Sequence, residues 1–145
     1  MKIHLRPATE ADVELTYAIK KEALKGYIEQ VWRWDESYQK DLHYKGFEPQ
    51  FILIIQADTA PVGYLELEET ETLLFIANIL IIEAYQNKGI GTVLLQNMIQ
   101  KAQEEQREVC LEVLKVNEKA RKLYERLGFV IYEEMEVKFK MRVIN

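Results

Sequence analysis

The sequence predicts an α/β (α+β) fold in which short apolar strands alternate with amphipathic helices. Residues 73–82 are apolar at nearly every position, which is typical of a central strand covered on both faces. A glycine-rich turn follows, and the apolar residues of 93–102 then recur at helical spacing. A second helical pattern begins at Asn117 and ends at Gly128. Together with the flanking patterns, these observations predict the element order β-α-α-β-β-β-α-β-α-β-β.

The N-terminal third is expected to hold one strand and the first helices. Residues 2–6 form a short strand, and Thr9 begins a helix with Asp12 placed for a capping box. Gly26 is expected to end this helix near residue 25. Two further helical pieces cover 27–34 and 35–44, the second capped by Asp35 or Ser37.

The remaining elements follow from alternation and turn signals. The turn 58–61, Asp-Thr-Ala-Pro, separates two strands. The expected elements are strands 51–57, 62–68 and 73–82, a helix from Gly89 to about residue 106, a strand 108–114, the Asn117 helix, and a final hairpin of 129–132 and 137–143.

Residues 86–91, Gln-Asn-Lys-Gly-Ile-Gly, form an anion-binding pattern between the central strand and the next helix. Glycines let a ligand approach the backbone, and the free N–H groups of a helix N-terminus attract phosphate. Lys88 adds a positive charge. A dinucleotide fingerprint fits poorly, because Leu94 stands where a third glycine is needed. A triphosphate loop does not fit either, because the lysine precedes the glycine.

Residues 117–129 form a second pattern, Asn-Glu-Lys-Ala-Arg-Lys-Leu-Tyr-Glu-Arg-Leu-Gly-Phe. Asn117 can cap a helix whose apolar residues recur at positions i, i+3, i+4 and i+7. Gly128 ends the helix as a C-terminal glycine does. The two patterns therefore occur in order, separated by one helix and one strand.

The two patterns together resemble the signatures of the GNAT acetyltransferase family, and residues 3–12 resemble its first strand and helix start. The resemblance covers nearly the whole chain and is weakest over about 27–50. It implies one domain, 1–145, with a three-layer fold around a mixed sheet of about seven strands. It also implies that acetyl-coenzyme A is bound by Ile79, Leu80, Ile81, Gln86, Asn87, Lys88, Gly89, Ile90, Gly91, Thr92 and Asn117.

The same resemblance implies acetyl transfer from a thioester to an amine. This reaction needs an amine that loses a proton, a stabilised oxyanion and a thiolate that is protonated. Tyr124 stands where the family carries its general acid, although spacing alone would also place Tyr124 on a packed helix face. The family's oxyanion donor is a backbone N–H of the central strand.

The general base is not fixed by the sequence. Some members of the family carry a glutamate on the central strand, but this chain has Phe75 to Asn78 there. Glu66 and Glu68 on the preceding strand are the nearest substitutes, although both also fit an exposed surface. Ordered water is a further option, and Glu66 is the favoured residue.

The acceptor is expected to contact Tyr27, Trp32 and Trp34, where aromatic residues alternate with acids. Such a mixture can bind an ammonium group by cation–π contact and charge pairing. The alternative is that Tyr27, Val31 and Trp34 form a stripe facing the core. The expected acceptor is a small-molecule amine, or a lysine or N-terminal amine of a peptide.

Composition limits the other functions. The net charge of −5 argues against a nucleic-acid binder, and no long apolar run or leader indicates a membrane or export. Cys110 cannot form an internal disulfide, which favours a cytoplasmic protein, and its core-like strand favours a buried, unreactive thiol. His4 and His43 lack metal-ligand spacing, so no metal is expected.

The sequence therefore predicts an N-acetyltransferase. The alternatives are a non-catalytic acyl-coenzyme-A-binding or partner-binding module, and an acyltransferase acting on a hydroxyl. The apolar final hairpin leaves a homodimer open.

Overall fold

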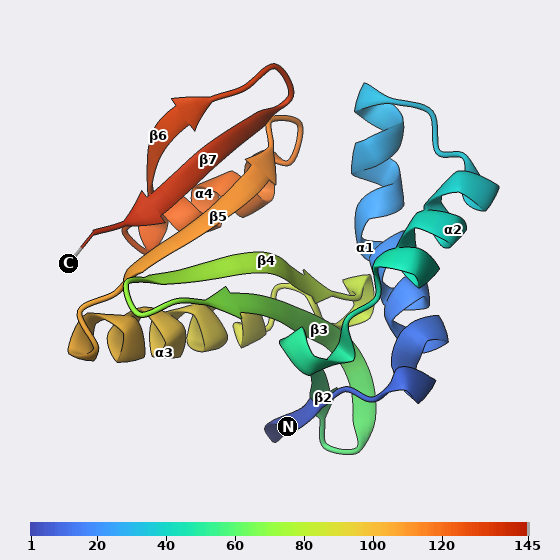
Figure 1. The fold of residues 1–145 in the computed structure, drawn as a ribbon, viewed down its shortest axis with the longest axis horizontal. Helices are drawn as coiled ribbons and strands as arrows, with labels where there is room; N and C mark the ends of the chain where they lie inside the picture. Colours follow the sequence, from blue (N-terminus) through green and yellow to red (C-terminus); the bar gives the residue numbers. More distant parts are fainter. Residues whose placement is uncertain (145) are drawn as a thin grey trace. The chain divides into compact units, whose positions relative to one another are not determined.

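The computed structural model describes residues 1–144 of the chain. Within these residues, seven strands form a mixed sheet in the order β1-β2-β3-β4-β5-β7-β6, accompanied by four α-helices (Figure 1). The predicted α/β class and element order are confirmed. The strands are β1 (Ile3–Pro7), β2 (Ile52–Ala57), β3 (Ala60–Glu69), β4 (Leu73–Ile81), β5 (Glu108–Leu114), β6 (Val130–Glu134) and β7 (Lys138–Val143). The helices are α1 (Val13–Val31), α2 (Glu36–Gly46), α3 (Ile90–Glu104) and α4 (Glu118–Arg126).

The chain divides into two compact units. Unit 1 comprises Met1–Glu66 with Asn78–Lys88, and unit 2 comprises Leu67–Ala77 with Gly89–Asn145. β3 and β4 each continue from one unit into the other, since the boundaries fall within both strands. The anion-binding pattern of 86–91 is divided between Lys88 and Gly89 in the same way.

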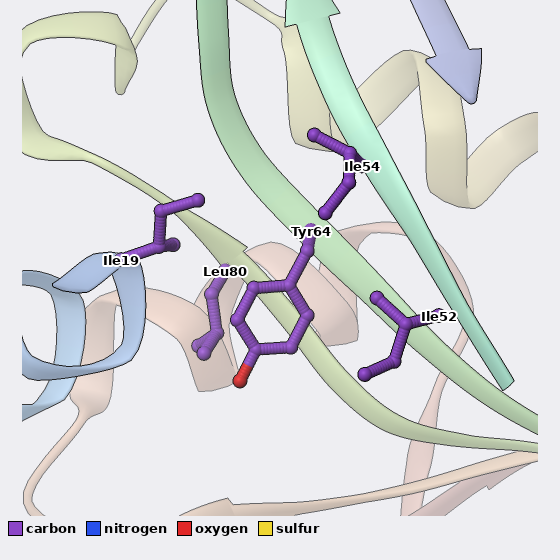
Figure 2. Packing of buried hydrophobic residues seen from close by; sticks show 5 residues of the cluster. All are labelled: Ile19, Ile52, Ile54, Tyr64 and Leu80. Carbon is purple, nitrogen blue, oxygen red and sulfur yellow. The ribbon is translucent and has the colours of Figure 1, made fainter. Parts of the chain in front are cut away.

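The core of unit 1 forms between α1 and the strands β2, β3 and β4. Ile19 of α1 packs in one cluster with Ile52, Ile54, Tyr64 and Leu80, and all five are buried (Figure 2). Side chains of a strand alternate between its two faces, so Ile52 and Ile54 point to the same side of β2. The antiparallel register pairs Ile54 with Tyr64 and Ile52 with Glu66. This register places Glu66 beside the apolar cluster.

α1 continues through Gly26, so the expectation that Gly26 ends a helix near residue 25 was wrong. A Cβ atom on Gly26 would meet nothing within 4 Å, so the position lies on an open helix surface. Glycine there costs about 1 kcal/mol in helix propensity. Burial of Ile19 and Tyr17 on the inner face outweighs this cost, and residues 27–31 become the end of α1 rather than a separate helix.

The caps of the first two helices agree with the sequence prediction. The Thr9 N–H donates to Asp12 Oδ2 at 2.8 Å, and a short 3₁₀ turn, Glu10–Asp12, precedes α1. Asp35 caps α2, because its Oδ1 accepts from the Tyr38 N–H at 3.0 Å. The predicted turn 58–61 is shorter in the structure, since Ala60 and Pro61 already belong to β3.

His43 of α2 is buried against α1. Its Nε2 lies 2.9 Å from Thr16 Oγ1, and its ring centroid lies 5.5 Å from that of Tyr17. Burial, followed by the positive charge of Lys20, lowers the pKa of His43 to about 4. The imidazole is therefore neutral in the folded chain at neutral pH.

This burial predicts a loss of stability in mild acid. A group whose pKa is lowered on folding contributes stability that is present above its unfolded pKa and is lost as the pH falls through its folded pKa. Burial lowers the pKa of His43 from 6.5 to about 4, so the loss of stability is expected within this pH range. Urea unfolding of the wild type should show this decline between pH 6.5 and 4. His43→Gln should flatten it, whereas His4→Gln should not, and equal slopes in all three proteins would contradict the assignment.

Unit 2 is built around β5. The first residues of β4 pair with β5 in parallel, from Leu73 opposite Glu108 to Ile76 opposite Leu111. β7 lies antiparallel on the other side of β5, and β6 pairs with β7 at the edge of the sheet. α3 and α4 both contact β5. Within residues 1–144, no helix is long and apolar enough to cross a membrane.

Candidate functional site

Gly63 of β3 fixes the direction of the main-chain groups of β4. A Cβ atom built on Gly63 would lie 2.1 Å from the carbonyl oxygen of Leu80, so this carbonyl points directly at β3. The Ile82 N–H also points to β3, because it donates to the Val62 carbonyl at 2.9 Å. Main-chain groups alternate in direction along a strand. Those of Ile79 and Ile81 therefore point to the opposite edge of β4.

The end of unit 1 leads from β4 into the predicted anion-binding turn. Gln86 Nε2 donates to the Ile81 carbonyl at 2.8 Å, which ties the turn to the end of β4. Asn87 has a φ of 61°, in the left-handed region that asparagine tolerates better than most residues. Lys88 follows it and is exposed. The turn therefore presents an ammonium group to solvent.

The second part of the anion-binding pattern, Gly89 to Gly91, belongs to unit 2 and forms the N-terminus of α3. Gly89 has a φ of 80°, which only glycine adopts without strain, and its carbonyl accepts from the Val93 N–H at 3.0 Å. Within residues 1–144, no side chain caps the first turn of α3. Ile90 is buried and anchors the turn, whereas Gly91 and Thr92 are half-buried. The uncapped N–H groups and the helix dipole form a donor set that suits phosphate oxygens.

Tyr124 lies on the buried face of α4. The side chain is 8% exposed and its ring centroid lies 5.7 Å from that of Phe129. Burial raises the pKa of Tyr124 to about 12, so the phenol keeps its proton at neutral pH. Among residues 1–144, the Tyr124 hydroxyl has no hydrogen-bond partner. The ring of Tyr124 therefore packs in the core, as helical spacing allowed, while its hydroxyl has no partner within the described chain.

Asn117 is the N-cap of α4, as predicted from its position. Its Oδ1 accepts from the Ala120 N–H at 3.2 Å. This bond uses the oxygen of the amide and leaves the Nδ2 hydrogens for another partner.

Glu66 is half-buried and held in a defined position. Its Oε1 accepts from Asn78 Nδ2 of β4 at 2.8 Å. This contact fixes the carboxylate on the side of the sheet that faces α1, beside Tyr64 and Ile52. Glu68, the alternative base, is exposed. The structure thus distinguishes two glutamates that the sequence could not separate.

The three aromatic residues expected at the acceptor site differ in exposure. Trp34 is buried, and its Nε1 donates to Glu36 Oε1 at 3.2 Å. Glu36 also pairs with Lys21 and accepts from the Tyr17 hydroxyl, and these contacts lower its pKa to about 2. Tyr27 is half-buried and Trp32 is 52% exposed. Of the three, Trp32 presents the most ring surface to a ligand.

Two residues beside Glu66 were not among the sequence candidates. Lys20 follows Ile19 on α1 and interacts electrostatically with Glu66. Tyr64 is 1% exposed, and burial followed by the charge of Glu66 raises the pKa of its hydroxyl. The sequence could have indicated Lys20, because Thr16, Lys20 and Ala23 follow at helical spacing on the face of α1 that packs against the sheet. A charged residue in such a stripe marks either a snorkelling side chain or a buried polar group.

Cys110 behaves as its core-like strand indicated. Cys110 is buried, and burial raises the pKa of its thiol. Within residues 1–144, no group of three or more His, Cys, Asp or Glu side chains could hold a metal ion.

Comparison with known proteins identifies the family. Residues 16–129 match the model of the Acetyltransferase (GNAT) family, so the chain belongs to this family. It is therefore an acetyltransferase of this family. No curated protein matches the sequence.

Solved structures share the fold at low sequence identity. The PaiA N-acetyltransferase of Thermoplasma acidophilum, solved in complex with coenzyme A, superposes with a TM-score of 0.81 at 19% identity over 100% of both chains. An acetyltransferase of Thermus thermophilus gives a TM-score of 0.75 at 20% identity, over 98% of this chain and 96% of that one. The ribosomal-protein-S18-alanine N-acetyltransferase of Escherichia coli gives 0.70 at 19% identity, over 98% and 93%. These likenesses support the GNAT fold.

Proposed function

We propose that this chain is a single-domain N-acetyltransferase that moves the acetyl group of acetyl-coenzyme A directly to a primary amine. The acceptor is a small molecule, or a lysine or N-terminal amine of a peptide. No metal takes part in the proposed reaction. A cytoplasmic location and a homodimer stay predictions of the sequence.

The observation that carries this proposal is the N-terminus of α3. A left-handed Gly89 introduces a fifteen-residue helix whose first turn no side chain caps, directly after an exposed lysine. We assign the pyrophosphate to Gln86, Asn87, Lys88, Gly89, Ile90, Gly91 and Thr92. Asn117 reaches the coenzyme with its Nδ2 group in this proposal.

The pantetheine arm is assigned to β4 at Ile79, Leu80 and Ile81. Ile79 and Ile81 supply main-chain groups, because these point away from β3, whereas the Leu80 carbonyl points toward Gly63. Leu80 itself contributes through the buried side chain that supports the strand. The oxyanion donor is then a β4 N–H group from this outward-facing set.

In the proposed reaction, each of two side chains transfers one proton. Glu66 accepts the proton that the amine loses as the new C–N bond forms. Tyr124 supplies the proton taken up by the departing sulfur as the C–S bond breaks. Burial raises the pKa of Tyr124, so the phenol is still protonated when the C–S bond begins to break. Its hydroxyl therefore hydrogen-bonds the sulfur and transfers the proton late, when negative charge has accumulated there.

Glu66→Gln tests the assignment of the base. The amide keeps the size of the side chain and can still contact Asn78, but it cannot take up a proton. We expect kcat/KM for the amine to fall about 100-fold, which is the lower end for a positioned base. The loss should be greatest near neutral pH and should shrink at high pH, where the amine is already deprotonated.

Glu68→Gln on the same strand is the matched control, because Glu68 is exposed. It should leave kcat/KM within about twofold of the wild type. An equal loss in both variants, or in neither, would contradict Glu66 as the base.

Direct transfer is tested by initial velocities with both substrates varied. Double-reciprocal plots should give intersecting lines, whereas parallel lines would indicate an acyl-enzyme and contradict direct transfer.

A further inference from the structure

Four polar side chains of unit 1 are linked through Glu66, by one hydrogen bond or by electrostatic interaction, and we call them the inner polar cluster: Lys20, Tyr64, Glu66 and Asn78. Tyr64 belongs to the apolar cluster under Ile19, and Figure 2 shows its hydroxyl directed away from Ile54. Glu66 follows Tyr64 by two positions on β3, so both point to the same face. Asn78 joins the cluster through its 2.8 Å bond to Glu66.

Lys20 enters the cluster from α1, directly after Ile19. Its side chain is half-buried, and among residues 1–144 its ammonium group is in no hydrogen bond or ion pair. Burial lowers the pKa of Lys20, and the attraction of Glu66 opposes this effect. Removing an ammonium group from water without a close partner costs free energy. The chain therefore maintains a positive charge near Glu66 that its own side chains do not neutralise by contact.

Glu66 is the charged group of unit 1 that acts electrostatically on the pKa of Lys20. On α2, the positive charge of Lys20 acts on His43, which burial keeps neutral above about pH 4. Glu66 is already engaged by Asn78, and Tyr64 keeps its proton because burial raises its pKa. The cluster thus offers one anion that is held in place and one cation that is free to bind a ligand.

We infer that the acceptor is an aminocarboxylate, a small amine that carries a carboxylate close to the nitrogen. This inference rests on the proposed acetyl transfer and names its substrate class. The carboxylate binds the Lys20 ammonium, and the amine binds the Glu66 carboxylate that takes up its proton. A plain alkylamine binds Glu66 alone and leaves Lys20 without a partner, and a polyamine also brings a second positive charge toward Lys20.

The test compares amines that differ only in the carboxylate. The pairs are glycine with methylamine and β-alanine with ethylamine, each assayed for coenzyme A release with wild type, Lys20→Met and Lys25→Met. Methionine keeps the length and the apolar stem of lysine. Lys25 is the matched control, because it lies on the same helix with its side chain 43% exposed.

We expect the wild type to prefer the carboxylated member of each pair at least tenfold in kcat/KM, mainly through KM. Lys20→Met should reduce this preference to about one, Lys20→Arg should restore part of it, and Lys25→Met should keep it. Equal use of both members by the wild type would overturn the inference and leave acetyl transfer standing. A preference that survives Lys20→Met would overturn it as well.

A binding measurement covers the case in which no amine is acetylated, which would contradict the proposed function itself. Thermal unfolding is then followed with glycine or β-alanine at millimolar concentration against methylamine or ethylamine. The inference predicts a rise in Tm with the carboxylated compounds that is absent in Lys20→Met. The absence of any such rise in the wild type would overturn it.

Discussion

Tyr124→Phe should lower kcat at least about 100-fold while leaving acetyl-coenzyme A binding unchanged. The substitution removes the proton that the departing sulfur needs and keeps the ring that packs on Phe129 at 5.7 Å. General acid catalysis by one side chain typically contributes a factor of about 10²–10⁴. Stability should change little, because the hydroxyl has no hydrogen-bond partner among residues 1–144. Steady-state kinetics with saturating acetyl-coenzyme A measures kcat, and thermal unfolding measures the stability.

Tyr132→Phe is the matched control for this prediction. Tyr132 lies in β6 of the same unit, is 42% exposed, and has an arginine side chain over its ring. Its loss of a hydroxyl should leave kcat within about twofold of the wild type. If Tyr124→Phe also stays within that range, the residue packs and does not donate a proton, and the proposed acid is wrong.

Gly63→Ala should destabilise the chain by about 3 kcal/mol and weaken acetyl-coenzyme A binding. The new methyl group would start 2.1 Å from the Leu80 carbonyl oxygen, which is a backbone atom and cannot rotate away as a side chain does. Overpacking of this kind costs about 1–3 kcal/mol when the surroundings can shift, and more when they cannot. Because β4 must move, the main-chain groups of Ile79 and Ile81 move with it. Urea unfolding and a titration with acetyl-coenzyme A measure the two effects.

Gly26→Ala is the same substitution as Gly63→Ala, but it should raise the stability of the chain. This glycine is in the middle of α1 and a Cβ atom there meets nothing within 4 Å. Alanine should therefore stabilise the chain by about 0.5–1 kcal/mol through helix propensity and the entropy of the unfolded state. A Gly63→Ala protein as stable as the wild type would show that β3 and β4 separate without cost, against the role assigned to Gly63.

The fold could be predicted from local patterns because those patterns carry strong physical signals. Asn117 caps α4 and Gly128 ends it with a φ of 101°, both at the expected positions. The strand from Glu108 to Leu114 has the predicted bounds. At both ends of α4, a residue with one strong conformational preference marks the boundary, so no tertiary information is needed there.

The sequence predictions were wrong or incomplete where tertiary packing determines the structure. Gly26 costs a helix little when Ile19 and Tyr17 anchor its inner face, and the sequence alone did not show this anchor. Gly63 was not singled out, because its importance depends on a carbonyl of the neighbouring strand. Lys20 and Asn78 reach Glu66 from different elements, so no spacing along the chain reveals them as neighbours.

The most direct test of the central claim is a mass measurement of both products after incubation with acetyl-coenzyme A and a panel of amines. The panel contains aminocarboxylates, alkylamines, polyamines and peptides, with matched alcohols in place of amines as a second set. We expect equal amounts of free coenzyme A and N-acetylated product for at least one amine class, and no ester from the alcohols. Stabilisation of the chain by acetyl-coenzyme A without any acetylated product would contradict this claim and indicate a coenzyme-binding module.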